Sequence, residues 1–93
     1  MTTRMKQKIT RAAAALKEYG AQEVYVFGSA AEGRLTKYSD VDMAVIGLPP
    51  KVFFAAMGEA MSILGRSLDL IDLDDGSAFT QYLKTNGKLQ RVI

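Results

Sequence analysis

Hydrophobic and polar positions follow two periods along this chain. Apolar side chains recur at helical spacing from Met5 to Tyr19, which predicts a first helix that Gly20 ends. Three short runs are instead alternating or continuously apolar, which is typical of strands, and they predict strands at residues 23–27, 40–46 and 67–73. The chain therefore alternates between helical and extended segments.

The remaining segments complete this pattern. Pro50 can open a helix over residues 51–64, which Gly65 is predicted to end, and we interpret its face of Phe and Met side chains as core. Shorter helices are predicted at residues 29–33 and 79–84, and an edge strand at residues 89–93. We expect one α/β domain over residues 1–93, a small mixed sheet of three to four strands with helices packed mainly on one face.

The composition narrows the chemistry. The 93 residues include no Cys and no His, so a metal ion would have to be held by oxygen ligands. The absence of Cys and of an apolar leader or membrane-length run favours a cytoplasmic protein. A net charge of +2 does not indicate nucleic-acid binding, and we interpret the basic residues of the first helix as a solvated face.

Two short motifs carry the candidate chemistry. Gly28 and Ser29 follow the first predicted strand, where a glycine permits close approach of a ligand and the serine can cap the next helix. Such a strand–turn–helix start suits a phosphate. Asp40 and Asp42 are two apart on a predicted strand, so their carboxylates share a face and would repel each other without a cation. Oxygen ligands of this kind favour Mg²⁺ or Mn²⁺.

At these residues the sequence resembles a known family. The stretch from Phe27 to Gly33, FGSAAEG, followed by YSDVD from Tyr38 to Asp42, is similar to the signature of the polymerase-β-like nucleotidyltransferases. The chain resembles above all the minimal nucleotidyltransferase (MNT) domains of that superfamily. The run SLDLIDL at residues 67–73 resembles the later strand that bears a third carboxylate in this family. The resemblance therefore spans nearly the whole chain.

The resemblance implies a site and its cofactors. Asp40 and Asp42 would hold divalent ions, Mg²⁺ or Mn²⁺, that also bind the phosphates of ATP. Gly28 and Ser29 would bind the phosphates that leave as diphosphate. Asp69 would be the third carboxylate, a metal ligand that helps to deprotonate the attacking hydroxyl.

Several neighbouring residues leave alternatives open. Asp72 is the rival of Asp69, but strand alternation points it to the other face, which favours a strand-end or turn role. Asp74 and Asp75 are typical of turns and caps. Many relatives carry Arg after the Gly-Ser pair, where this chain has Ala30, Ala31 and Glu32. Arg34 and Lys37 are the residues that could compensate.

A chain of this length leaves no room for an acceptor-binding domain. MNT proteins of this size resemble the antitoxins of two-gene toxin–antitoxin modules, whose partner is a helical HEPN-type ribonuclease. The resemblance implies transfer of AMP from ATP to a tyrosine hydroxyl of that toxin. Two alternatives stay open: an antitoxin that neutralises its toxin by binding alone, or a subunit that modifies a small molecule or RNA together with a separate partner.

Overall fold

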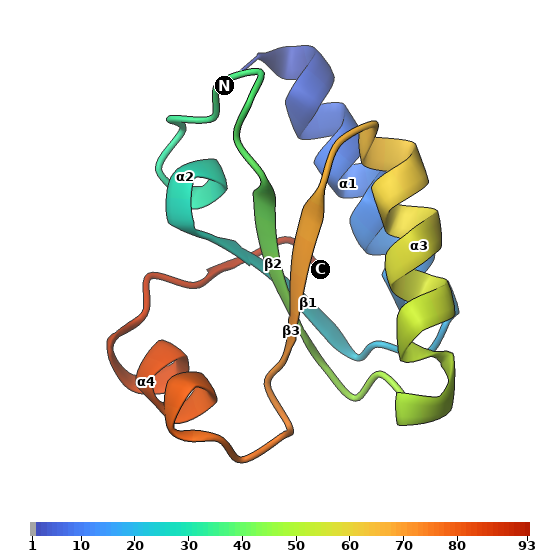
Figure 1. Ribbon diagram of the computed structural model, residues 1–93, viewed down its shortest axis with the longest axis vertical. Helices are drawn as coiled ribbons and strands as arrows, with labels where there is room; N and C mark the ends of the chain where they lie inside the picture. Colours follow the sequence, from blue (N-terminus) through green and yellow to red (C-terminus); the bar gives the residue numbers. More distant parts are fainter. Residues whose placement is uncertain (1) are drawn as a thin grey trace.

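A four-stranded mixed sheet lies at the centre of the fold, in the order β3-β2-β1-β4 (Figure 1). The computed structural model describes residues 2–93. Strand β1 is antiparallel to both of its neighbours, β2 and β4, whereas β2 and β3 run parallel. The strands have the following bounds: β1 Glu23–Phe27, β2 Val41–Ile46, β3 Leu68–Asp72 and β4 Gln90–Arg91. The predicted mixed α/β sheet is therefore confirmed.

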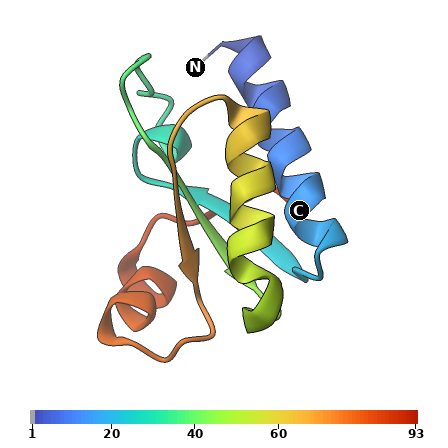
Figure 2. The same ribbon diagram turned by 45° about the vertical axis from the view of Figure 1, so that its right-hand side comes forward.

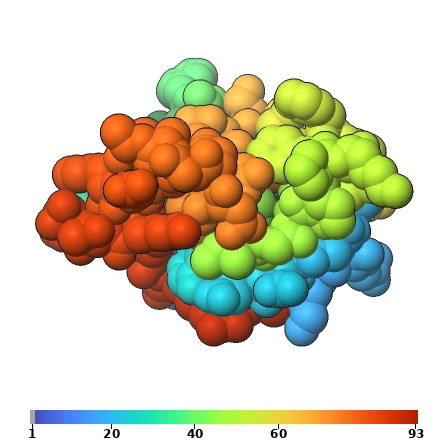
Figure 3. Space-filling view, turned by 90° about the horizontal axis from the view of Figure 1, so that it is seen from below, coloured from blue at the N-terminus to red at the C-terminus, as the bar shows by residue number. Residues whose placement is uncertain are grey.

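Helices cover the two faces of this sheet unequally. The long helices α1 (Thr3–Glu18) and α3 (Phe53–Leu64) lie side by side on one face (Figures 1 and 2). The other face is covered in part by α4 (Ala78–Asn86), whose Leu83 packs against Ala44 and Leu73. Seen from below, α4 and α3 form opposite sides of the molecule (Figure 3). The expectation that helices pack mainly on one face is confirmed.

Strand alternation divides the side chains between these two faces. Val24 and Val26 of β1, and Val41, Met43 and Val45 of β2, belong to the core beneath α1 and α3. The intervening positions of these strands belong to the second face, where α4 packs. Because the side chains alternate, Asp42 and Asp69 fall on the α4 face. The fold therefore leaves one partly open face for polar chemistry.

The first helix begins and ends close to the predicted positions. The side-chain oxygen of Thr2 accepts a hydrogen bond of 3.1 Å from the backbone N–H of Met5, which satisfies one of the free amides of the first turn. The predicted apolar stripe is buried against the sheet and α3 up to Leu16, whereas Tyr19 is half-buried and lies beyond the helix. The cap at the other end is Tyr19, one residue before Gly20.

Helix α3 differs from its prediction in where it begins and in which residues it buries. Pro50 opens a 3-10 turn, η1 (Pro50–Val52), and the α-helix begins only at Phe53. Its fully buried line consists of Ala56, Ala60 and Leu64, while the predicted Phe53, Met57 and Met61 are half-buried beside it. Small side chains at the contact let α3 pack closely against α1. Gly65 ends the helix in a left-handed conformation, as predicted, with φ 69°.

The C-terminal segments also depart from the predicted bounds. Helix α4 is longer than expected, and β4 has only two residues. Hydrogen bonds from the amide of Val92 to the carbonyl of Val24 (2.8 Å), and from the amide of Val24 to the carbonyl of Ile93 (3.0 Å), continue the pairing of this edge with β1. Among residues 2–93, none of the helices has the length and apolar character that a bilayer crossing requires.

Candidate functional site

Three positions on neighbouring strands line up across one end of the sheet. Asp42 of β2 is the register partner of Phe27 in β1 and of Asp69 in β3. Register partners carry their side chains on the same face, so the carboxylates of Asp42 and Asp69 both point to the α4 face. The two predicted acidic strands are thus adjacent, and their carboxylates are neighbours.

Asp40 lies just before β2, which begins at Val41 and not at Asp40 as predicted. Asp40 is exposed, and its two chain neighbours fix its backbone. The amide of Val41 donates a 3.0 Å hydrogen bond to the carbonyl of Ser67, and the carbonyl of Ser39 accepts one of 3.1 Å from Arg66. Asp40 is therefore held at the end of the sheet where β2 and β3 begin.

Gly28 meets the carboxylate of Asp42 directly. Its φ of 63° lies in the left-handed region, and a Cβ at this position would stand 2.4 Å from Oδ2 of Asp42. No side chain larger than hydrogen fits there without moving the carboxylate. The Gly-Ser turn and the Asp pair, which are separate motifs in the sequence, therefore form one site.

The structure corrects the predicted role of Ser29 as a helix cap. Helix α2 (Gly28–Ala31) begins one residue earlier than predicted, so Ser29 lies inside it. The cap position is Phe27, whose side chain makes no capping hydrogen bond. Because the first amides of a helix have no partner within the helix, the N–H groups of this turn are the donors available to an anion.

Electrostatics couple the three carboxylates. Burial raises the pKa of the Asp42 carboxyl above its ordinary value, and the negative charges of Asp69 and then Asp40 raise it further. These are the interactions that a divalent cation would reverse, and oxygen-only donors suit Mg²⁺. Within residues 2–93, no group of three acidic, His or Cys side chains is arranged so that it could hold a metal ion. The donor chemistry fits such an ion.

The remaining acidic residues of this region have structural partners. Asp72 is in register with Val45, which faces the core under α1 and α3, so it lies on the opposite face from Asp69. Its Oδ1 accepts a 2.9 Å hydrogen bond from the amide of Asp74, as a turn residue would. The side chain of Asp74 in turn accepts a hydrogen bond of 2.7 Å from the amide of Gly47. These contacts agree with the predicted turn roles.

Asp75 stabilises the start of α4. Its Oδ1 accepts hydrogen bonds of 2.9 Å from the Ser77 amide and from the hydroxyl of Thr80, which is buried. These hydrogen bonds, that of the Ser77 amide first, hold the pKa of the Asp75 carboxyl below its ordinary value. Asp75 is thus a capping residue, as its turn sequence indicates.

Arg34 and Lys37, the two cations that could compensate for the missing Arg, both contact side chains close to them in the sequence. Arg34 forms an ion pair with Glu32, and the ammonium of Lys37 lies 5.2 Å from the ring centre of Tyr38. Both side chains are exposed on the segment that leads to Asp40.

Nothing in the sequence pattern marks Arg66. Its Nη1 donates hydrogen bonds to the carbonyl oxygens of Thr36, at 2.6 Å, and Ser39, at 3.1 Å. Because its acceptors are backbone carbonyls, which every residue has, no sequence motif indicates this contact. The only available signal is the position of Arg66 two residues before β3.

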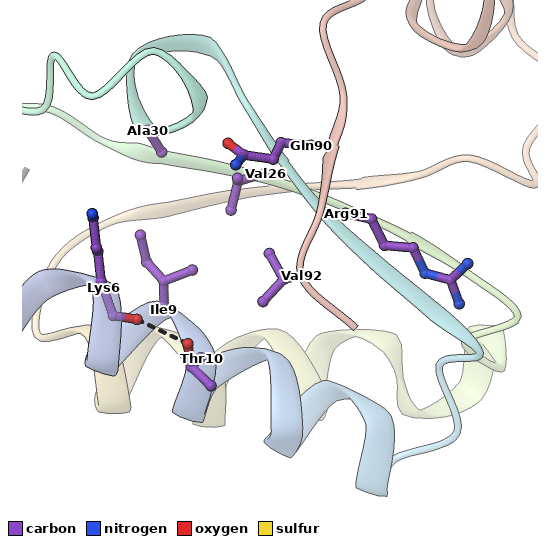
Figure 4. Close-up of a pocket in the computed structure, with 8 residues that line it drawn as sticks. All are labelled: Lys6, Ile9, Thr10, Val26, Ala30, Gln90, Arg91 and Val92. Atoms are coloured by element: carbon purple, nitrogen blue, oxygen red, sulfur yellow. Dashed lines mark hydrogen bonds between the residues drawn. The ribbon is translucent and has the colours of Figure 1, made fainter.

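A hollow of about 300 Å³ lies away from the carboxylates. It is bounded by α1, the edge strand β4 and the end of β1 (Figure 4). Val26, which lines it, belongs to the core face beneath α1, whereas Asp42 is on the α4 face. The hollow is therefore not part of the carboxylate site.

Comparisons with known proteins agree with this geometry. The sequence matches the family described as "Polymerase beta, Nucleotidyltransferase" over residues 7–89. No match was found among curated proteins. A toxin–antitoxin complex crystallised with AMP-PNP contains a similar chain, with 25% identity, a TM-score of 0.72 and coverage of 90% of this chain and 72% of that chain.

Two further structures share the fold. One is the complex of a tri-AMPylated HEPN toxin with an MNT antitoxin from Shewanella oneidensis (22% identity, TM-score 0.68, 96% of this chain and 71% of that chain). The other is a minimal nucleotidyltransferase (21% identity, TM-score 0.70, 89% of this chain and 92% of that chain). The resemblance drawn from the two motifs and the acidic third strand is confirmed.

Proposed function

The chain belongs to the polymerase-β nucleotidyltransferase family, and on that premise we propose that it transfers AMP from ATP to a tyrosine hydroxyl of a HEPN-type toxin. In this role it is the antitoxin of a two-gene module. The observation that carries the proposal is the contact between the Gly28 turn and Asp42, which is itself in register with Asp69. A phosphate-binding turn beside paired carboxylates suits phosphoryl-type transfer.

Each residue of the site has a part in this reaction. Asp40, Asp42 and Asp69 are the carboxylates that would hold Mg²⁺ or Mn²⁺, which supplies charge neutralisation at the phosphates when bound. Gly28 lets the backbone approach the phosphates, and Ser29, the next residue of the same turn, binds them together with Gly28. Asp69 accepts the proton of the attacking tyrosine hydroxyl while the oxygen of that hydroxyl bonds to the α-phosphorus. The bond from that phosphorus to the bridging oxygen of the β-phosphate breaks, and diphosphate leaves.

The relatives support the choice of nucleotide and partner. The complex with AMP-PNP pairs a chain of this fold with an ATP analogue and a toxin. In the Shewanella oneidensis complex the HEPN toxin itself carries AMP. Exposed aromatic side chains on the loop before Asp40 and on α4 support docking of a protein on this side: Tyr38 is 84% exposed, Phe79 52% and Tyr82 58%.

The proposal is tested by incubating the purified chain with ATP, Mg²⁺ and the toxin that is encoded beside it, and by measuring AMP transfer to that toxin. Intact-mass measurement should reveal added AMP on the toxin, and Asp40→Asn combined with Asp42→Asn should reduce it to background. The doubly substituted chain should unfold at no lower temperature than the parent, because it removes charges that repel one another. Glu59→Gln, which removes an exposed carboxylate of α3, is the matched control and should transfer normally.

The opposite result identifies the alternative function. If the double variant neutralises the toxin in cells as well as the parent does, and no AMP appears on the toxin with either chain, the protein is an antitoxin that acts by binding alone. Undiminished transfer by the double variant would exclude the carboxylate mechanism.

A further inference from the structure

Arg66 connects the two segments that deliver the carboxylates. It lies between Gly65, which ends α3, and Ser67, which precedes β3 and Asp69. Its side chain reaches across to the loop before β2, where a single nitrogen, Nη1, donates to the carbonyls of Thr36 and Ser39. These contacts join residues that are 30 and 27 positions apart in the chain.

The loop that receives Arg66 is already closed on itself. The amide of Ser39 donates to the carbonyl of Thr36 at 3.2 Å, and the amide of Thr36 donates to Oγ of Ser39 at 3.1 Å. The two hydroxyl oxygens lie 3.0 Å apart, and the amide of Tyr38 donates to Oγ1 of Thr36 at 3.3 Å. Arg66 therefore holds a preformed turn as a unit, because it binds the carbonyls at both ends of that turn.

Asp40 lies between two tethers to the same short segment. On one side the carbonyl of Ser39 accepts from Arg66, and on the other the amide of Val41 donates to the carbonyl of Ser67. The backbone on both sides of Asp40 is thus fixed to Arg66 and Ser67, the two residues that directly precede β3, the strand that carries Asp69. Without the first tether, the backbone before Asp40 would lose its hydrogen bonds to Arg66, while the one from Val41 to Ser67 would remain.

We propose that Arg66 is a positioning residue that sets the place of the Asp40 carboxylate relative to Asp42 and Asp69. The inference rests on the proposed metal-dependent function. Arg66 acts through Asp40 and does not itself bind the ion. Residues that orient metal ligands in this way commonly matter to metal affinity by about tenfold to a hundredfold.

The hydrogen bonds, and not the charge alone, carry this role. Neither of the two ion pairs within residues 2–93 includes Arg66. Lys37 is a cation of the loop that Arg66 contacts, and its ammonium lies over the ring of Tyr38. Lys37→Ala therefore removes one positive charge near Asp40 and leaves the Arg66 contacts intact, which makes it the matched control.

The experiment measures binding of Mn²⁺ alone to the full chain, by the spin-resonance signal of free Mn²⁺, beside thermal unfolding. Arg66→Ala should weaken Mn²⁺ binding by about tenfold or more, with a midpoint of unfolding close to that of the parent. Arg66→Lys, which retains a donor on a long side chain, should restore part of the affinity, and Lys37→Ala should bind as the parent does. Amide exchange at Ser39 and Val41 should accelerate in Arg66→Ala only.

Parental Mn²⁺ affinity in Arg66→Ala, or an equal loss in Lys37→Ala, would overturn the inference. Should Arg66→Ala fail to fold, Arg66→Gln takes its place. Its side chain is shorter than that of arginine, so the same loss of Mn²⁺ affinity and the same faster amide exchange are expected. Asp42→Asn separates this inference from the proposed function. If Asp42→Asn loses Mn²⁺ while Arg66→Ala retains it, only the role of Arg66 fails. If the parent binds no Mn²⁺, or Asp42→Asn binds it as the parent does, the proposed metal site fails as well.

Discussion

At the scale of single residues, Asp69 and Asp72 differ in what their side chains face. Asp69 is the register partner of Asp42, whereas Asp72 is that of Val45 on the other side of the sheet. Asp72 also accepts the amide of Asp74 and so belongs to the turn. Three residues of separation on a strand are enough to give two aspartates of one motif different tasks.

We therefore expect Asp69→Asn to reduce AMP transfer at least as severely as loss of Asp40 or Asp42. Asp72→Asn should change transfer by less than about tenfold and stability by less than about 0.5 kcal/mol, because asparagine keeps an oxygen that can accept the hydrogen bond from the amide of Asp74. Transfer rates with labelled ATP and chemical denaturation measure the two effects. Strong loss of transfer in Asp72→Asn with normal transfer in Asp69→Asn would reverse the assignment.

Gly28 is the second residue whose identity the site requires. In Gly28→Ala the new methyl group would collide with Oδ2 of Asp42, so transfer should fall sharply, and the left-handed backbone should cost about 1–2 kcal/mol. Gly76→Ala is the control, because its φ of 72° is equally strained and nothing lies within 4 Å of its Cβ. We expect Gly28→Ala to lose at least as much stability as Gly76→Ala, and we expect the loss of transfer in Gly28→Ala alone. Normal transfer in Gly28→Ala would contradict the close approach.

At the scale of elements, α4 depends on its cap to cover the carboxylate face. The side-chain oxygen of Ser77 accepts the Thr80 amide at 3.1 Å, and Thr80 is buried with its hydroxyl bonded to Asp75. Helix α4 has only nine residues, so it is short for an independent helix and relies on such local contacts and on Leu83.

Ser77→Ala should accordingly lower the free energy of unfolding by about 1 kcal/mol, the usual cost of losing a helix cap. Ser62→Ala removes an exposed serine from within α3 and should be neutral or slightly stabilising, because alanine favours helix interiors. Urea denaturation followed by circular dichroism compares the two. An equal effect of both substitutions would argue against the cap.

At the scale of the whole molecule, the two faces of the sheet are specialised. One is closed by α1 and α3 and holds most of the core, and the other carries the carboxylates and α4. We expect the toxin to dock on the second face at the end of the sheet where β2 and β3 begin, near the loop at residues 34–39, because the transferred AMP must meet its acceptor beside Asp42 and Asp69. The loop at residues 74–77 follows the far end of β3, where Asp74 bonds to Gly47, and is not beside the carboxylates. That one domain accounts for residues 1–93 stays a prediction.

Exposed aromatic residues allow this docking face to be tested. Tyr38→Ala, which removes a side chain that is 84% exposed on the loop before Asp40, should weaken toxin binding by about tenfold or more, as loss of an interface aromatic commonly does. Phe54→Ala on α3 removes a side chain that is 76% exposed on the opposite face and should leave binding unchanged. Calorimetric titration with the toxin gives both affinities. Loss of binding in Phe54→Ala alone would move the interface to the α3 side.

The sequence by itself determined the elements and the types of residue in the site. Periodicity located α1, the three main strands and α3, since burial of one face imposes it directly on the chain. Alternation placed Asp69 and Asp72 on opposite faces, and glycine at position 65 marked a helix end. These features depend on residues close together in sequence, which is why a single chain reveals them.

The tertiary structure alone decided how these pieces meet. Strand order and register set Asp42 beside Asp69, and the turn after β1 brought Gly28 against the Asp42 carboxylate. The tie from Arg66 to the carbonyls of Thr36 and Ser39 spans about thirty residues. Its acceptors are backbone atoms that every residue possesses, so no pattern of side chains announces it. Such contacts exist only once the sheet has assembled, because packing of the whole chain fixes them.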